Sequence, residues 1–156
     1  MKPDTERKQR TIANNRKALH DYFVVQSFEA GIVLTGTEVK SLRAGKVNFK
    51  DSYATFPTKN SDEFVLMNMH ISPYEHGNRE NHEPLRPRRL LVKRNEAKRY
   101  RQAVQEQGLS IVPLSIYFSG PYVKVELAIV KGKKHYDKRA DIKEKDIARA
   151  MRRGDE

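Results

Sequence analysis

The chain has 156 residues, of which 33% are charged and 37% hydrophobic, so it can enclose only one small core. Its 31 basic and 20 acidic side chains give a formal net charge of +11, which indicates a polyanionic partner such as RNA, DNA or an anionic membrane surface. No apolar run reaches the length of a membrane-spanning helix, and the absence of cysteine excludes disulfides, thiolate zinc sites and thiol catalysis.

The N-terminal third is predicted to open with a mobile segment and continue into a β-hairpin. Residues 1–13 are polar and basic with no hydrophobic period, so we expect them to be flexible. Residues 14–19 can form one helical turn with an asparagine cap. Two runs rich in β-branched and aromatic residues follow, at 22–28 and 32–34, and residues 29–31 between them are typical of a turn.

A short helix is predicted after this hairpin. Thr37 can cap its start, Glu38 lies in the first turn where the helix dipole favours a negative charge, and Gly45 ends it. The helix would cover one end of the sheet and present three basic side chains outward, those of Lys40, Arg43 and Lys46.

The middle of the chain predicts a second hairpin, a long loop and a second helix. Residues 51–57 and 63–71 have strand character, and the polar stretch 72–87 is long enough to be a functional loop or a disordered one. A short strand at 88–92 then leads into a helix that Asn95 caps and that ends near residue 108.

Two strands at 110–118 and 122–130 complete the predicted body. In the second strand, apolar and polar residues alternate, which is typical of a strand with one buried face and one wet face. Six short strands with small helices predict a mainly β fold, namely an OB-like closed antiparallel barrel over residues 14–130. Residues 131–156 form a basic tail that is predicted to be disordered in the free protein.

The basic excess is concentrated in three segments. Residues 1–20, 86–101 and 131–156 carry +4, +7 and +4, whereas the remainder carries −4. Three basic segments around a slightly acidic body favour nucleic acid over a merely solvated surface. In the second segment, Leu91 can pack either in the core or against an exposed base.

Catalytic and metal-binding patterns are absent from the sequence. The five histidines are dispersed and the glycines form no nucleotide-binding motif, so we predict no catalytic residue, metal site or cofactor. Two further functions for a basic barrel remain open. One is a metal-dependent nuclease, which needs clustered carboxylates, whereas Glu29 and Glu38 are explained by a turn and a helix terminus. The other is an ordinary ribosomal protein.

Four strings occur in order and resemble the SmpB family, the SsrA-binding proteins of bacteria: NNRKALHDYF, FEAGIVLTGTEVKSLRAGKVNFKDSY, NRENHEPLRPRRLL and VKGKKHYDKRADIKEKD. The resemblance covers about residues 14–153. It implies a cytoplasmic, non-enzymatic adaptor that binds the tRNA-like part of transfer-messenger RNA (tmRNA) and enters stalled ribosomes for trans-translation. The implied partners are tmRNA and the small-subunit decoding centre, with EF-Tu and alanyl-tRNA synthetase acting through the same RNA. We expect a monomer.

The resemblance also implies roles for individual residues. Glu29, Leu91 and Lys124 match positions that bind tmRNA, and Thr37 stands, among the basic residues of the first helix, where some members have tryptophan. The tail is implied to work in the decoding centre and mRNA channel, through Lys131, Lys133, Lys134, Tyr136, Asp137, Lys138 and Arg139. A ring at Tyr136, where some members have histidine, can stack on an rRNA base. Residues 140–153 can form a helix on the ribosome, with an apolar side that includes Ile147 and Met151.

Overall fold

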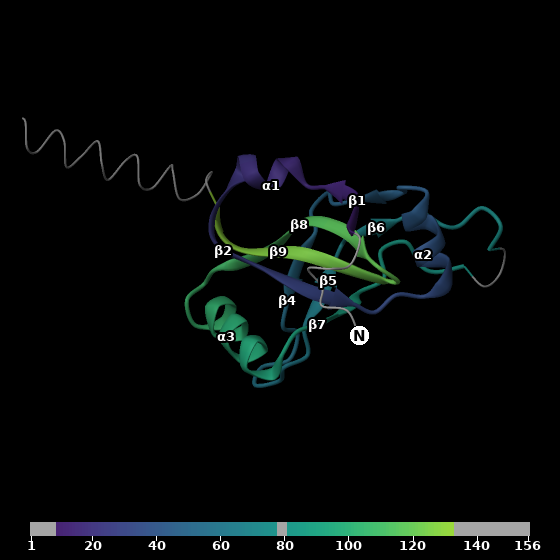
Figure 1. Ribbon diagram of the computed structural model, residues 1–156. Coiled ribbons are helices and arrows are strands. Elements are labelled where there is room, and N and C mark those ends of the chain that lie inside the picture. The colour runs from purple at the N-terminus through teal and green to yellow at the C-terminus, as the bar shows by residue number, and fades with distance from the viewer. Residues whose placement is uncertain (1–8, 78–80, 133–156) are drawn as a thin grey trace, which may run out of the picture.

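The computed structural model describes residues 9–77 and 81–132 of the chain (Figure 1). In chain order its elements are β1 (Gln9–Asn14), α1 (Arg16–Asp21), β2 (Tyr22–Ile32), α2 (Gly36–Arg43), β3 (Val47–Asn48), β4 (Tyr53–Thr55), β5 (Val65–Met67), β6 (His70–Ile71), β7 (Arg88–Leu91), α3 (Arg94–Gln105), β8 (Ser110–Ser119) and β9 (Tyr122–Gly132). Among these helices, none is long and apolar enough to cross a membrane.

Six strands close into a ring in which every pairing is antiparallel. The order is β8-β4-β5-β7-β2-β9, and β9 pairs back onto β8. The prediction of a closed antiparallel barrel of about six strands is therefore confirmed. Closure removes the free sheet edges and leaves an outer face on which side chains can contact a partner. The short strands β3 and β6 form a separate two-stranded sheet.

The barrel interior is filled by the alternating apolar residues of its strands. Val123, Val125, Leu127 and Ile129 of β9 are all buried, as their period of two predicts. Helix α3 packs against the core mainly through Ala97, Tyr100 and Ala103. The ring of Tyr100 stacks on that of Phe28, with 3.8 Å between centroids. A smaller cluster joins α1 to the outside of the barrel, through Ala18, Val112, Ala128 and Val130.

The predicted hairpin over residues 22–34 is wrong, because residues 22–32 form one continuous strand, β2. It pairs along β9 from Tyr22↔Gly132 to Gly31↔Lys124, with a bulge between Val24 and Gln26. At Gly31 a second neighbour, β7, pairs on the other edge. Pairing on both edges outweighs the turn preference of the residues at 29–31.

The prediction that residues 1–13 are flexible is wrong for residues 9–13. They belong to β1, which pairs with the second half of β8, from Gln9↔Ser119 to Asn14↔Ser115. Strand β4 pairs with the same edge of β8 near the start of that strand, at Ile111, so β1 and β4 occupy successive parts of one edge. The hydrogen bonds of β1 come from a partner about 100 residues away, which the local pattern of a polar segment cannot reveal.

The helix caps also differ from the prediction. Thr35, not Thr37, caps α2, because its amide donates to Glu38 Oε1 (2.9 Å) while its hydroxyl accepts from the Glu38 amide. The predicted stop at Gly45 is confirmed by its φ of +71°. Helix α3 begins at residue 94 after Lys93, so the predicted Asn95 cap is wrong.

The second predicted hairpin is confirmed by the pairing of β4 with β5. The strand predicted over 63–71, however, is divided into β5 and β6. Asn68 lies between them with a φ of +60°, which turns the chain so that β6 pairs with β3 instead of continuing the barrel. This turn places the start of the long loop beside α2, where β6 and α2 are in contact.

Candidate nucleic-acid interface

Four residues from separate parts of the sequence form a row across the outer face of the barrel. Strand register joins Leu91 to Gly31, Gly31 to Lys124 and Lys124 to Tyr117. Residues directly opposite one another on neighbouring strands present their side chains on the same face. We call these four residues the Gly31 row. Glu29 precedes Gly31 by two positions on β2 and therefore lies on the same face.

The carboxylate of Glu29 is held at both oxygens. Tyr117 donates its hydroxyl to Oε2, and Lys124 Nζ lies 2.9 Å from Oε1. Both partners belong to the Gly31 row, so the acid fixes their positions. A carboxylate retains further lone pairs on each oxygen and can accept from a base amino group or a 2′-hydroxyl. The predicted contacts Glu29 and Lys124 are thus brought together as one hydrogen-bonded unit.

Leu91 lies on the outside of the barrel. Its neighbour Leu90 is 3% exposed, whereas Leu91 is 50% exposed, so of the two alternatives the sequence leaves open, packing in the core is wrong. A Cβ at Gly31 would lie 3.4 Å from Leu91 Cβ, so glycine leaves a shallow apolar step there. Such a step can receive the edge or face of a base.

Two residues of this outer face, Arg89 and Tyr117, are not identified by the sequence alone. Arg89 precedes Leu91 by two positions and is exposed on the same side of β7. Tyr117 stands opposite Lys124 and reaches Glu29. The period of two along each strand is the signal that identifies both, once Leu91 and Lys124 are known to face outward.

The predicted contacts of α2 lie next to this row, because only three residues separate the end of β2 from the start of α2. Thr37 Oγ1 is 2.9 Å from His82 Nδ1, and His82 Nε2 donates to the Ile71 carbonyl at 2.9 Å, so His82 is a buried link between α2 and β6. Lys40 Nζ lies 5.3 Å from the centre of the Tyr74 ring.

The other two basic residues of α2 and its C-terminal turn also have defined contacts. Lys46 Nζ lies 2.9 Å from Glu75 Oε1 in the long loop. The backbone carbonyl of Arg43 accepts from Arg10 Nη2 at 3.1 Å, while the Arg43 side chain is exposed. The long loop therefore contacts Lys40 through Tyr74 and Lys46 through Glu75.

Replacing His82 with alanine is expected to lower the free energy of unfolding by about 2 kcal/mol, because the buried Ile71 carbonyl loses its donor and Thr37 loses its acceptor. Chemical denaturation of the two proteins measures the difference. His76, in the same loop but exposed, provides the control, since its alanine variant removes only an edge contact with Tyr74. Equal losses for the two variants would contradict the linking role of His82.

A buried ionic cluster lies behind the interface. Arg88 is 0% exposed and donates to Glu38, to the Met69 carbonyl and, at 3.0 Å, to the Pro84 carbonyl. Arg86 Nη2 lies 2.6 Å from the other oxygen of Glu38. Two of the basic residues in the segment 86–101, Arg86 and Arg88, are thus held by ion pairs with Glu38.

Burial alone would raise the pKa of the Glu38 carboxyl. Hydrogen bonds from Arg86, from the Thr35 amide and from Arg88 outweigh burial and hold the pKa below its ordinary value of 4.5. Glu38 is therefore ionised at neutral pH and serves as the counter-ion of two arginines. Both carboxylates considered for a nuclease, Glu29 and Glu38, are engaged by cations, and in the described ranges no three His, Asp or Glu side chains could hold a metal ion.

Of the predicted tail contacts, only Lys131 belongs to the described part of the chain. It pairs with Phe23 near the end of β9, which continues to Gly132, two residues beyond the predicted strand. The remaining predicted contacts lie outside the described residues: Lys133, Lys134, Tyr136, Asp137, Lys138, Arg139, Ile147 and Met151.

Comparison with known proteins gives a consistent result. A family model described as "SmpB protein" matches residues 12–155. An SsrA-binding protein of Desulforudis audaxviator is 54% identical over 148 residues, covering 92% of this chain and 95% of the relative. That of Moorella thermoacetica is 55% identical over 151 residues, covering 94% and 96%. A solved structure described as "tmRNA-SmpB: a journey to the center of the bacterial ribosome" superposes with a TM-score of 0.65 at 48% identity, covering 78% of this chain and 83% of that one.

Proposed function

This chain belongs to the SmpB family of SsrA-binding proteins, and from that premise we propose that it binds the tRNA-like domain of tmRNA and delivers that RNA to stalled ribosomes. The observation that carries the proposal is the convergence of Leu91, Gly31, Lys124 and Tyr117 on one face, with Glu29 beside them. A row with a cation, a phenol, a carboxylate and an apolar step offers contacts for both the backbone and the bases of a folded RNA.

Each member of the interface has a distinct role in this proposal. Lys124 pairs with phosphate, and its ion pair with Glu29 keeps it oriented before the RNA arrives. Glu29 accepts from a base amino group or a 2′-hydroxyl. Leu91 and the step at Gly31 receive a base, and Arg89 extends the positive edge of the surface. Thr37, Lys40, Arg43 and Lys46 extend the contact onto α2.

The C-terminal segment has the second half of the proposed role. Residues 131–156 carry ten basic and six acidic side chains, and we propose that they act in the decoding centre and mRNA channel of the small subunit, with residues 140–153 helical there. Within this scheme the protein is a cytoplasmic, monomeric adaptor without catalytic activity. EF-Tu and alanyl-tRNA synthetase act on the RNA that it carries.

Leu91→Ala is expected to weaken binding of the tRNA-like domain about tenfold, because burying an exposed leucine side chain against a base removes apolar surface from water, which contributes about 1.5–3 kcal/mol when burial is complete. Leu85→Ala is a matched control, since Leu85 is also 50% exposed but lies in the long loop. Fluorescence titration of the labelled RNA domain at constant salt measures both affinities. If the two variants lose affinity equally, or neither does, the Gly31 row is not the RNA contact.

A further inference from the structure

One side chain, that of Asn81, closes the first half of the long loop upon itself. Asn81 Oδ1 accepts from the Tyr74 amide at 2.9 Å, and Asn81 Nδ2 donates to the Tyr74 carbonyl at 2.6 Å. The Gly77 amide donates to the same carbonyl at 2.9 Å. A side-chain amide can serve a backbone donor and a backbone acceptor at once, because it carries both kinds of group. We call Tyr74, Gly77 and Asn81 the Asn81 bridge.

Gly77 leaves the space that the Asn81 bridge needs. A Cβ at this position would lie 2.7 Å from Asn81 Nδ2, a distance at which one of the two atoms must move. The same Cβ would lie 3.2 Å from Thr37 Cγ2, so the bridge rests on the first turn of α2. Thr37 also bonds to His82, the residue after Asn81. The closed part of the loop is therefore fastened to α2 as well as to itself.

The bridge fixes the two loop residues that hold lysines. The ring of Tyr74 lies under Lys40 Nζ, 5.3 Å from it, and Glu75 Oε1 lies 2.9 Å from Lys46 Nζ. The hydrogen bond from Lys46 lowers the pKa of the Glu75 carboxyl, so this pair is charged at neutral pH. A hollow of about 230 Å³ lies between this part of the loop and the C-terminal end of α2. Packing against α2 alone therefore does not set the positions of Tyr74 and Glu75.

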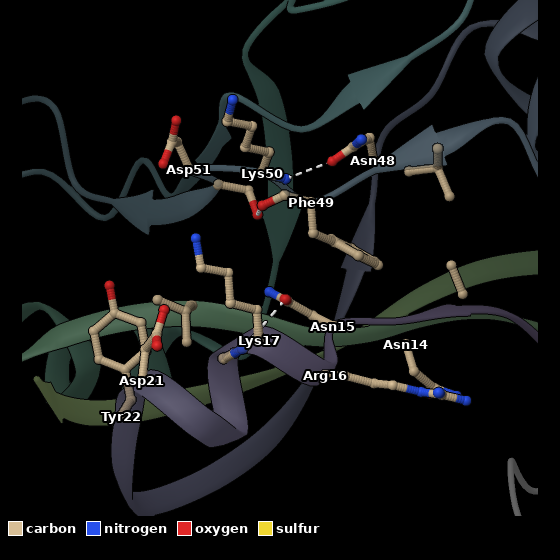
Figure 2. A pocket seen from close by; sticks show the side chains of 15 residues that line it. Asn14, Asn15, Arg16, Lys17, Asp21, Tyr22, Asn48, Phe49, Lys50 and Asp51 are labelled. Atoms are coloured by element: carbon tan, nitrogen blue, oxygen red, sulfur yellow. Dashed lines mark hydrogen bonds between the residues drawn. The ribbon is translucent and has the colours of Figure 1, made fainter. Parts of the chain in front are cut away.

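Other exposed lysines are not held in this way. Figure 2 shows Lys17 and Lys50 beside a hollow of about 370 Å³ between α1 and the segment 47–52. Within the described ranges, neither ammonium group has an ion pair or lies over an aromatic ring, although both residues are exposed. Holding a lysine is thus not a general property of this surface. Lys40 and Lys46 are both held by one short segment of one loop.

We propose that Asn81 is a positioning residue for RNA recognition, which acts through the loop to orient Lys40 and Lys46 before the RNA arrives. The inference rests on the proposed function, because it takes both lysines to contact the tRNA-like domain. A free lysine side chain loses rotamer freedom when it pairs with a phosphate, and orientation in advance reduces that loss. The bridge gives the lysines of α2 the arrangement that Glu29 gives Lys124 in the Gly31 row.

NMR of the lysine side chains in the full chain tests the orienting step without RNA. The protons next to Lys40 Nζ are expected upfield of those of other exposed lysines, because the ring current of Tyr74 shields them. Asn81→Ala is expected to remove this upfield shift. Gly77→Ala, which deletes no hydrogen-bonding group, is expected to remove it too. A wild type without the shift, or an Asn81→Ala variant that keeps it, overturns the proposal.

Titration with the tRNA-like domain then measures the effect on binding. Asn81→Ala is expected to weaken affinity about fivefold, and Gly77→Ala by a similar factor. Combining the two changes is expected to weaken affinity no further than Asn81→Ala alone, because the added methyl group no longer meets the amide. Gln107→Ala, which removes an exposed side-chain amide just after α3, is the control and leaves affinity unchanged. Unchanged affinity in Asn81→Ala overturns the proposal.

The same titration in a protein without the two lysines separates positioning from a merely structural role. In the Lys40→Ala/Lys46→Ala background, adding Asn81→Ala is expected to leave affinity unchanged, because the bridge then has no lysine to orient. A further fivefold loss in that background would show that the loop acts through the fold or through its own RNA contact, and would overturn the proposal. If Leu91→Ala still weakens binding of the tRNA-like domain, the proposed function stands without the inference.

Discussion

Ending the chain after Gly132 is expected to abolish peptide tagging on stalled ribosomes while changing affinity for the tRNA-like domain by less than about threefold. The cut leaves β9 and its pairing with β2 and β8 intact. It removes a segment that begins at the opposite end of β2 from the Gly31 row, and distant sites without shared partners contribute independently. A reconstituted translation reaction on a message without a stop codon measures tagging, and titration of the RNA measures binding.

The cut position matters for this experiment. A cut within β9 would remove strand pairs with β2 and β8 and confuse unfolding with loss of function, whereas residue 132 is the last one in the strand. Thermal unfolding of the truncated protein provides the control and should match that of the full chain. Parallel loss of tagging and of RNA binding in a folded truncated protein would contradict the division into an RNA-binding barrel and a ribosome-binding tail.

Glu38→Gln is expected to lower the free energy of unfolding by about 3–5 kcal/mol, because it leaves the fully buried Arg88 without its counter-ion. This is a large part of the stability of a small domain, which is commonly about 5–15 kcal/mol. The glutamine keeps the volume of the side chain, so the loss reports the charge. Glu63→Gln is the control, since Glu63 is exposed. Urea denaturation compares the variants, and equal stability of Glu38→Gln and wild type would contradict the structural role of the cluster.

The same cluster predicts how stability depends on pH. Because the pKa of Glu38 lies below its ordinary value in the folded protein, its contribution is fully present above about pH 4.5 and is lost as pH falls through the folded value. Between neutral and acidic pH the wild type should therefore lose more stability than Glu38→Gln. Denaturation curves at several pH values, run on both proteins, measure this difference.

The strands with the strongest alternation were predictable, and those that depend on distant partners were not. In β9, apolar residues at every second position place Val125 and Leu127 inside without reference to any other element. Strand β1 is polar and is held by the edge of β8, so its own residues carry no signal. In β2, the glycine that suggests a turn instead lies between two neighbouring strands.

The candidate site was predictable only in part, for a similar reason. The resemblance indicates Glu29, Leu91 and Lys124, but their assembly on one face follows from strand register that no local pattern contains. Leu90 and Leu91 are chemically identical, and only the pairing of β7 decides which one faces outward. Arg88 looks like a phosphate contact because its partner Glu38 is 50 residues away in the chain.

The central claim is that the barrel recognises the tRNA-like domain of tmRNA as a specific fold, and one affinity comparison tests it most directly. The full chain is titrated at about 0.15 M salt with that domain and with an unrelated RNA hairpin of equal length, because at this salt nonspecific phosphate contacts alone are weak. We predict that the tRNA-like domain binds at least about a hundredfold more tightly. Equal affinity for the two RNAs would contradict the proposed function.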